Sequence, residues 1–461
     1  MMKQTTGPDA TTRPRRPPGP KGIPLIGNLL EARRDPLRFV LNLARDYGDV
    51  ARYRLGIYTG YLVNHPDYIQ HVLQLNHQNY SKENYTYQML RPVLGKGLLT
   101  SDGPHWLRQR RLIQPAFKRK RLADFGTLIT TATIELLEDW DSRAAQNRPI
   151  DVAEEMRHLT LRIIGETLFG TDVSVESGRI GTAFTSLNED VTYRLKTVFV
   201  PPLWVPTPRN LAFRRARTEL DAIVYAVIAN RRQSGDSGSD LLGMLLAARD
   251  EANGEGMTDQ QLRDEVMTLM LAGHETTATA LTWTWYLLSE HPRVVQRMWA
   301  ELDDVLGGRI PTVDDLPALV YMKQVIQESL RLYPPVWIIS RTAIDDDRVG
   351  PYEIPAGTVV LLSQYVTHRH PDFWGNPEHF EPERFSPERT ANRHRYAYFP
   401  FGGGPRLCIG DNLAMMEIQL ILATIAQRYR LELAPTHPVK PEPLVTLRSR
   451  YNMKMMIHAR R

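Results

Sequence analysis

Apolar residues recur at helical spacing through the middle of the chain. From about residue 105 to residue 300 this helical period dominates, with interruptions at "FVPPLWVPTP" (199–208) and "QSGDSGSD" (233–240). Thr258 precedes a long amphipathic stretch and Gln261 follows three positions later, which predicts a capping box and a helix continuing to about Glu290. After residue 410, "DNLAMMEIQLILATIAQRYR" is apolar on nearly every side, which predicts a buried helix.

Shorter segments show the patterns of strands. "GDVARYRLGIYTGYLVN" (48–64) predicts two strands around a glycine turn, and "PYEIPAGTVVLLSQYV" (351–366) predicts strand and turn. The chain contains no internal repeat and no long linker. We therefore predict a mainly α fold with a smaller β portion, an α+β fold. Residues 1–22, rich in proline and arginine, are expected to form a flexible or extended arm.

Composition and charge narrow the function only in part. Of 461 residues, 42% are hydrophobic and 24% are charged, which is ordinary for a globular protein. No apolar run approaches the ~18 residues of a membrane span, and residues 1–24 lack the apolar core of a secretory signal. We expect no transmembrane anchor and a cytoplasmic location. The net charge is +5, but basic residues are scattered apart from 108–121, so we expect no nucleic-acid partner.

The one cysteine, Cys408, lies in "FGGGPRLCIG" (401–410). The glycines give the backbone freedom, and Pro405 excludes a continuous helix. Such a turn can direct N–H groups at the sulfur, and a helix starting near Gly410 or Asp411 would place its positive end beside it. Both effects favour a thiolate. A buried apolar cysteine, a nucleophile, a redox sensor and a metal ligand all remain open from this segment alone. A phosphate-binding loop is disfavoured because no Lys-Ser/Thr follows the glycines.

The order of residues in this loop resembles the haem-binding loop of the cytochrome P-450 family of haem-thiolate monooxygenases, in its soluble bacterial type. Four more motifs occur in the family's order: "HWLRQR" (105–110), "LAGHETTATA" (271–280), "QESLRLYPP" (327–335) and "FEPERF" (380–385). The resemblance extends from about residue 17 to the C-terminus. It implies a single triangular cytochrome P-450 fold, with residues 23–461 forming one domain.

The resemblance also implies haem b (iron protoporphyrin IX) as the cofactor and an activity. Cys408 would be the axial thiolate, and one atom of O2 would enter a hydrophobic small molecule by hydroxylation or epoxidation. Glu275 and Thr276 would relay protons. The Thr276 hydroxyl can bond to the Ala272 carbonyl, and Gly273 weakens the helix by roughly 1 kcal/mol relative to alanine. The remaining implied haem contacts are Trp106, Arg110, Ala272, Arg341, Phe401, Arg406 and Gly410, with His105 as a further candidate.

Two further sets of residues follow from the resemblance. Glu328 and Arg331, three apart on a helix, would form a structural network with Arg384. A substrate pocket would need apolar or aromatic side chains, and the candidates are Tyr85, Tyr87, Met89, Phe199, Leu203, Trp204, Val336, Trp337, Ile338 and Leu447.

Electrons are expected from separate proteins, because no flavin domain follows the haem helix. The expected partners are a ferredoxin (or flavodoxin) and its NAD(P)H-dependent reductase. The basic run with Arg108, Arg111, Lys118, Arg119 and Lys120 could attract an acidic ferredoxin.

Three other functions are compatible with parts of the sequence. A peroxide-driven peroxygenase on the same fold would usually lack the Glu275–Thr276 pair, and a non-catalytic haem sensor or carrier would not need it. A serine hydrolase built on "GDSGS" (235–239) is disfavoured, because that stretch lies in a polar segment with no strand before it.

Overall fold

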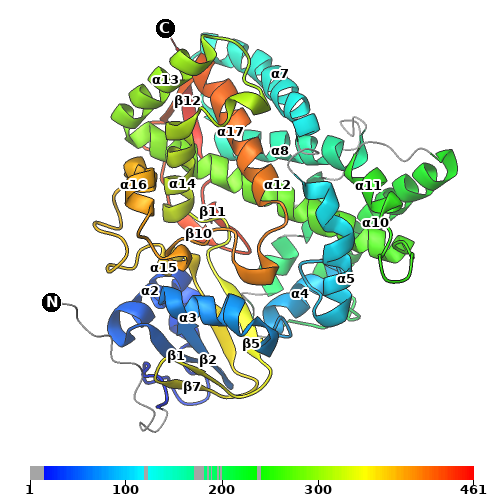
Figure 1. Ribbon diagram of the computed structural model, residues 1–461, viewed down its shortest axis with the longest axis vertical. Helices are drawn as coiled ribbons and strands as arrows, with labels where there is room; N and C mark the ends of the chain where they lie inside the picture. The colour runs from blue at the N-terminus through cyan, green and yellow to red at the C-terminus, as the bar shows by residue number, and fades with distance from the viewer. Residues whose placement is uncertain are drawn as a thin grey trace. The chain divides into compact units, whose positions relative to one another are not determined.

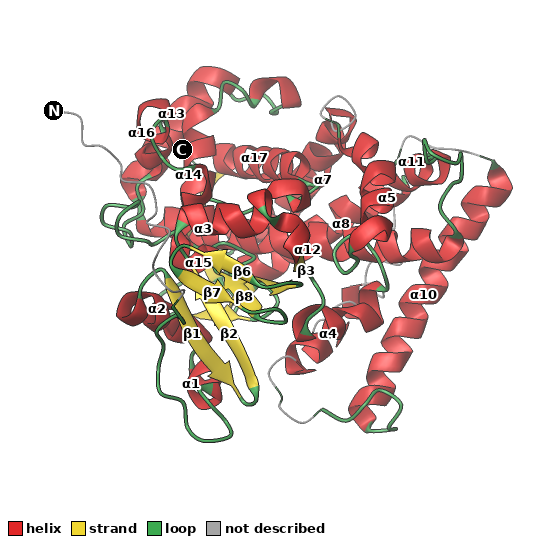
Figure 2. Cartoon of the chain, turned by 60° about the horizontal axis from the view of Figure 1, so that its bottom comes forward, coloured by secondary structure: helices red, strands yellow, loops and turns green. Residues whose placement is uncertain are grey.

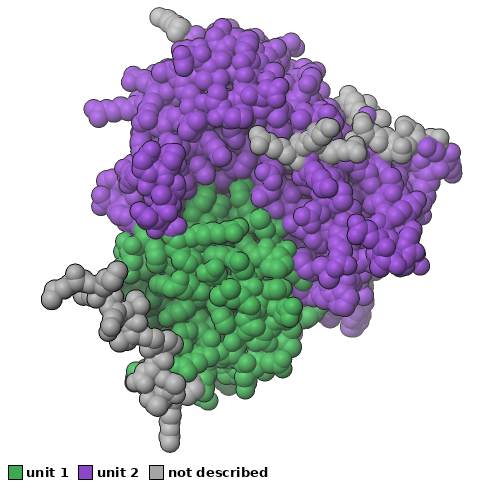
Figure 3. All heavy atoms as spheres, viewed as in Figure 1, with its two compact units in different colours: residues 1–84, 338–373, 394–407 green, residues 85–337, 374–393, 408–461 purple. Residues whose placement is uncertain are grey.

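Contacts within the chain divide it into two compact units, which Figure 3 colours separately. Unit 1 comprises residues 1–84, 338–373 and 394–407, and unit 2 comprises 85–337, 374–393 and 408–461. The computed structural model describes residues 15–118, 123–170, 181–183, 186–187, 189–194, 197, 200–235 and 240–460. The chain passes between the units repeatedly, and the expectation of one domain over 23–461 stays a prediction.

Unit 1 is organised around a five-stranded sheet with the order β1-β2-β8-β5-β3 (Figure 2). The β2–β8 pair is parallel and the other pairs are antiparallel. The two strands predicted around Gly56 are confirmed. Val50, Val63 and Leu362 are fully buried in the core of this unit. Its elements are α1 (Leu29–Arg34), α2 (Pro36–Tyr47), α3 (Pro66–Gln70), α15 (Gln364–Thr367), β1 (Val50–Leu55), β2 (Tyr58–Val63), β3 (Tyr80–Ser81), β5 (Ile339–Ala343), β6 (Asp347–Val349), β7 (Tyr352–Ile354) and β8 (Val359–Leu362).

Two sequence expectations for unit 1 are refined. The segment 351–366 forms strands β7 and β8 as predicted, but its last residues begin the short helix α15, whose first turn is capped by the Ser363 hydroxyl. The described part of the N-terminal arm is extended and hydrogen-bonded: the Arg15 N–H donates to the Pro351 carbonyl at 3.1 Å, and the Pro18 carbonyl accepts from Arg52 N–H at 2.7 Å.

Unit 2 is mostly helical, with α12 packed along α8 and also against α14 and α17 (Figure 1). Two small sheets, β4-β12-β9 and β10-β11, belong to it. Among the described residues no helix is both long and apolar enough to cross a bilayer. The elements of this unit are α4 (Tyr85–Leu94), α5 (Gly103–Ile113), α7 (Gly126–Ala145), α8 (Val152–Phe169), α10 (Pro208–Ser234), α11 (Leu241–Ala247), α12 (Asp259–Glu290), α13 (Pro292–Leu306), α14 (Val320–Leu332), α16 (Pro387–Thr390), α17 (Asp411–Arg428), β4 (Ile150–Asp151), β9 (Tyr429–Leu433), β10 (Pro441–Pro443), β11 (Leu447–Ser449) and β12 (Lys454–Ala459).

The long helix α12 begins and ends where the sequence predicts. Thr258 accepts from the Gln261 N–H and the Gln261 side chain accepts from the Thr258 N–H, so the predicted capping box is present. The break before α10 is confirmed over the described residues 200–207. Helix α10 ends at Ser234 and α11 begins at Leu241, while residues 236–239 of the second predicted break lie outside the described residues. The predicted helix α17 is buried over most of its length, which explains why its sequence is apolar on nearly every side.

Candidate functional site

The loop before Cys408 depends on glycine at two positions in unit 1. Gly404 has φ of +64°, and a Cβ there would lie 1.8 Å from the Leu73 carbonyl oxygen. A Cβ at Gly403 would overlap the Tyr396 ring at 2.4 Å. These close approaches leave no room for a side chain, so the glycines are required by packing as well as by backbone conformation.

Cys408 lies directly before α17, with Gly410 as the N-cap residue of that helix. Its side chain is exposed to solvent. Burial raises the pKa of the Cys408 thiol, while the Gly410 N–H, which donates to the sulfur, and the charge of Arg110 act in the opposite direction. Exposure and desolvation are compatible, because solvent can reach an atom from one side while protein surrounds it on the others. The predicted helix start is confirmed, but the prediction of a lowered thiol pKa is wrong for the protein alone, because desolvation is the largest effect.

Helix α5 carries the candidates Trp106 and Arg110 four residues apart, and both are half-buried. Burial lowers the pKa of the Arg110 guanidinium, and Cys408 and Asp411 partly offset this effect through their charges. His105 is engaged elsewhere, because its Nε2 lies 3.1 Å from the Lys96 carbonyl oxygen. Arg110 and the Cys408 sulfur therefore belong to one electrostatic environment within unit 2.

The acid and the hydroxyl of α12 lie on different faces of the helix. The Thr276 hydroxyl donates to the Ala272 carbonyl at 2.5 Å, as predicted, and this face is partly accessible. Glu275 is buried, and its Oε1 accepts from the Thr446 hydroxyl at 3.0 Å. A Cβ at Gly273 would meet Ile164 at 2.8 Å, which gives the packing reason for a glycine inside this helix. The helix is continuous through the motif.

Glu328, Arg331 and Arg384 are brought together in unit 2. Arg331 donates through Nε to Glu328 Oε2 at 2.7 Å and through a terminal nitrogen to Oε1 at 2.8 Å, and neither side chain is exposed. Arg384 Nε lies 3.3 Å from Glu328 Oε1, and burial lowers the pKa of Arg384, an effect that Glu328 offsets. The carbonyls of Pro377 and His379 accept further hydrogen bonds from Arg331.

Three of the predicted haem contacts belong to unit 1. Arg341 lies in β5, opposite Val360 of β8, and is buried with its side chain donating to the Ser340 carbonyl at 2.8 Å. Phe401 and Arg406 lie in the glycine turn and are half-buried.

The predicted pocket residues have different environments. Tyr87 is buried, whereas Tyr85 is half exposed and its hydroxyl donates to the Arg194 carbonyl at 3.1 Å. Leu447 is fully buried, and its carbonyl accepts from the Trp283 indole at 2.7 Å. Trp204 is 78% exposed. Of the others, Met89, Leu203, Val336, Trp337 and Ile338 are half-buried, and Phe199 lies outside the described residues.

The cytochrome P450 family model matches residues 17–455. The chain belongs to the cytochrome P450 family. This confirms the family predicted from the loop and the four motifs.

Relatives of this cytochrome P450 match over nearly its whole length. Cyclooctatin synthase of Streptomyces melanosporofaciens is 38% identical, over 95% of this chain and 95% of that protein. Cyclooctat-9-en-7-ol 5-monooxygenase of the same organism is 37% identical, over 90% of this chain and 89% of that protein. Pentalenene oxygenase of Streptomyces avermitilis is 34% identical, over 96% of this chain and 97% of that protein.

A solved structure supports the same conclusion. The crystal structure of the cytochrome P450DA heme domain is 29% identical in sequence and has a TM-score of 0.89, covering 97% of this chain and 98% of that one. The mainly α fold with a smaller β portion is thereby confirmed as the cytochrome P450 fold. The protein is a cytochrome P450 monooxygenase, and the family implies haem b as its cofactor.

The donor set of this cytochrome P450 fits a haem. Cys408 is the one cysteine in the chain. Within the described residues, no group of three or more His, Cys, Asp or Glu side chains could hold a metal ion. A single accessible sulfur is sufficient to hold a haem iron, because the macrocycle supplies four other ligands. The neighbouring Arg110 suits a carboxylate on that macrocycle, because a guanidinium can donate two parallel hydrogen bonds.

The residues that surround Glu275 carry no signal in the local sequence. Thr446 and Arg448 approach the Glu275 carboxylate from the C-terminal hairpin, which is formed by β10 and β11 (residues 441–449). More than 170 positions separate each of them from Glu275 along the chain. The same holds for Trp374 and Arg393, which carry no local signal; the Arg393 guanidinium stacks 4.1 Å from the Trp374 ring centroid, beside the Arg331 network. No local motif marks any of these residues, since each contact depends on long-range packing.

Proposed function

We propose that this cytochrome P450 oxidises a cyclic terpenoid, with electrons supplied by a ferredoxin. The observation that carries the substrate class is the sequence similarity, over nearly the whole chain, to three proteins whose names contain cyclooctatin, cyclooctat-9-en-7-ol and pentalenene. Half-buried apolar residues from the segment after α14, Val336 and Trp337, are consistent with a pocket for such a molecule.

We assign the cofactor contacts to Cys408 and its surroundings. When bound through a thiolate, haem activates O2 and inserts one oxygen atom into the substrate. Cys408 would bind the iron, and the Gly410 N–H would hold the sulfur by the hydrogen bond that it already donates. Trp106, Arg110 and Arg341 would bind the propionates, while Ala272, Phe401, Arg406 and Gly410 would contact the ring. Glu328, Arg331 and Arg384 would brace this side of the protein.

Glu275 and Thr276 would supply protons to the reaction. The Thr276 hydroxyl, on the accessible face of α12, would hold a proton donor at the reacting oxygen. Glu275 is buried on another face, so its side chain must rotate about its own bonds to pass a proton toward Thr276. The Glu275 carboxylate that has given up its proton would then take up a new proton from the protein side of α12.

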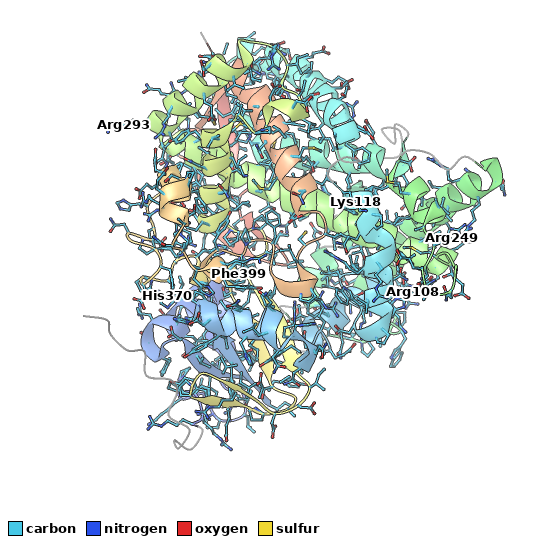
Figure 4. The ribbon with its side chains drawn as sticks, in the orientation of Figure 1. Arg108, Lys118, Arg249, Arg293, His370 and Phe399 are labelled. Carbon is cyan, nitrogen blue, oxygen red and sulfur yellow. The ribbon has the colours of Figure 1, made fainter. Side chains whose placement is uncertain are left out.

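A ferredoxin would dock on the basic surface formed by Arg111, in the last turn of α5, and by Lys118, which follows that helix. Arg111 and Lys118 are exposed. The sequence candidate Arg108 is excluded from this surface, because it forms an ion pair with Asp250 at 2.8 Å, and Arg119 and Lys120 lie outside the described residues. Figure 4 labels Arg108 and Arg249 at the right of the view, with Lys118 above Arg108. A flavodoxin is the second candidate partner, and a cytoplasmic location would suit either.

Reconstitution tests this function. The purified holoenzyme is mixed with a surrogate ferredoxin, its reductase, NAD(P)H and pentalenene under isotopically labelled O2. We expect a hydroxylated or epoxidised product that carries the label. A product without the label would contradict the proposal. So would a product that forms with hydrogen peroxide but not with NAD(P)H and the ferredoxin, or turnover of fatty acids but of no cyclic terpenoid.

A further inference from the structure

Glu275 is held by the C-terminal hairpin rather than by its own helix. The Thr446 hydroxyl donates to Glu275 Oε1 at 3.0 Å, and both side chains are buried. Arg448 Nε lies 3.6 Å from the same oxygen, with 23% of its side chain exposed. One residue thus fixes the carboxylate from within the protein, and the other links it to the surface.

A small cavity, with both apolar and polar side chains in its wall, lies beside these residues. Its volume is about 20 Å³, and Glu275 is one of its lining residues. The space is large enough for one water molecule, since the centre of a single water needs on the order of 10–15 Å³. Besides Glu275, the polar side chains in its wall come from α8, from α12 and from residues 448–452 near the C-terminus. They are Arg157, Thr279, Thr282, Arg448, Ser449 and Asn452.

The Ser449 hydroxyl is the hydrogen-bond partner that a water in this cavity would use. Its hydroxyl oxygen is buried and makes no hydrogen bond to any described residue. A buried hydroxyl without a protein partner costs about 1–3 kcal/mol unless a water satisfies it. A water in the cavity would have Ser449 and the Glu275 carboxylate as partners, while Arg448 leads from them to solvent.

We propose that this cavity is the entry through which protons reach Glu275, with Ser449 and one water as carriers and with Thr446 and Arg448 as positioning residues. The proposal rests on the proton-supply role given to Glu275 above. In each transfer the water gives one proton to the Glu275 carboxylate and takes one from the Ser449 hydroxyl, which regains a proton from solvent that enters beside the partly exposed Arg448. Glu275 returns to its charged form when it passes that proton toward Thr276, so each transfer moves one proton and leaves the carriers unchanged.

The first test compares the coupling of NAD(P)H consumption to product in variants of the holoenzyme. Ser449→Ala and Arg448→Gln are expected to raise hydrogen peroxide release about tenfold and to increase the rate ratio between H2O and D2O. Arg448→Lys keeps the charge and is expected to retain wild-type coupling. Matched controls are Arg450→Gln, an exposed arginine of the same hairpin, and Ser289→Ala, whose hydroxyl bonds to the Tyr286 carbonyl in α12. Neither control should change coupling.

The second test is structural and does not depend on turnover. A crystal structure of the holoenzyme should contain an ordered water within hydrogen-bond distance of Ser449 Oγ, and the Ser449→Ala holoenzyme should lack it. A dry cavity in the wild-type crystal overturns the proposal.

Glu275→Gln separates this proposal from the one on which it rests. If Glu275→Gln leaves coupling unchanged, the proton-supply role of Glu275 is wrong. If Glu275→Gln uncouples the enzyme while Ser449→Ala and Arg448→Gln do not, only the entry route is overturned.

Discussion

Arg331 binds both carboxylate oxygens of Glu328, at 2.7 and 2.8 Å, and neither side chain has any exposed surface. Exposed pairs of this kind contribute little, about 0–1 kcal/mol, but removal of one partner of a buried pair leaves a desolvated charge. Glu328 also accepts from the Glu381 N–H at 2.9 Å, so the pair ties α14 to the segment that carries Arg384.

Glu328→Gln should therefore destabilise the protein by about 3–5 kcal/mol, because two buried arginines lose their anion. The measurement is chemical denaturation of the holoenzyme, together with the yield of haem-loaded protein. Glu135→Gln is the matched control: it breaks the partly exposed Glu135–Arg162 pair and should cost less than about 1 kcal/mol. Equal costs for the two variants would contradict this view of the network.

Thr276→Ala should retain haem but divert electrons into hydrogen peroxide, since it removes the hydroxyl that we propose to hold the proton donor. The ratio of product to NAD(P)H consumed measures this directly. Thr424→Ala removes a hydroxyl that makes the same type of bond, to the Leu420 carbonyl at 2.7 Å, in α17. Coupling should stay at the wild-type value in that control. Unchanged coupling in Thr276→Ala would exclude the relay.

Charge reversal on the proposed docking surface should slow reduction by the ferredoxin. Arg111→Glu and Lys118→Glu are expected to lower the reduction rate at low salt and to flatten its dependence on ionic strength. Stopped-flow reduction at several salt concentrations is the measurement. Arg293→Glu, in α13 and away from Lys118 in Figure 4, supplies the control. If the salt dependence is the same in all variants, the ferredoxin docks elsewhere.

Glu417 should make stability fall as the pH rises. This side chain is buried in α17, and burial raises its pKa to about 8. A carboxyl whose folded-state pKa is raised contributes stability below its unfolded pKa, and that contribution is lost as the pH approaches 8. Glu417→Gln should thus gain more than about 1 kcal/mol relative to the wild type between pH 5 and pH 8. Glu138→Gln, exposed in α7, controls for the lost charge. A pH-independent difference for Glu417→Gln would contradict the prediction.

The sequence predicts those structural features that depend on residues close together in the chain. The capping box at Thr258 and the helix start at Asp411 depend on residues within a few positions, and both are confirmed. The bond from Thr276 to Ala272 follows from one helical turn in the same way. The loop glycines were predictable as turn residues, but the overlap of a Gly404 side chain with Leu73 was not, because the two are far apart in sequence.

The features of the site that the sequence does not predict depend on contacts between residues far apart in the chain. The polar surroundings of Glu275 come from a hairpin near the C-terminus, and no pattern in α12 indicates Thr446 or Arg448. Arg108 belonged to a basic run in the sequence, yet Asp250 neutralises it. The thiol pKa at Cys408 was predicted from the helix and the turn, whereas desolvation by residues from elsewhere in the chain dominates it.

The central claim is that the Cys408 sulfur is the protein's bond to the haem iron. The most direct test is the carbon monoxide difference spectrum of the reduced protein, expressed with ample haem supply, beside that of Cys408→Ser. The wild type should give the shifted absorption band of thiolate-ligated haem, and the variant should lose it. A colourless wild-type protein, or a Cys408→Ser protein with an unaltered spectrum, would contradict the account.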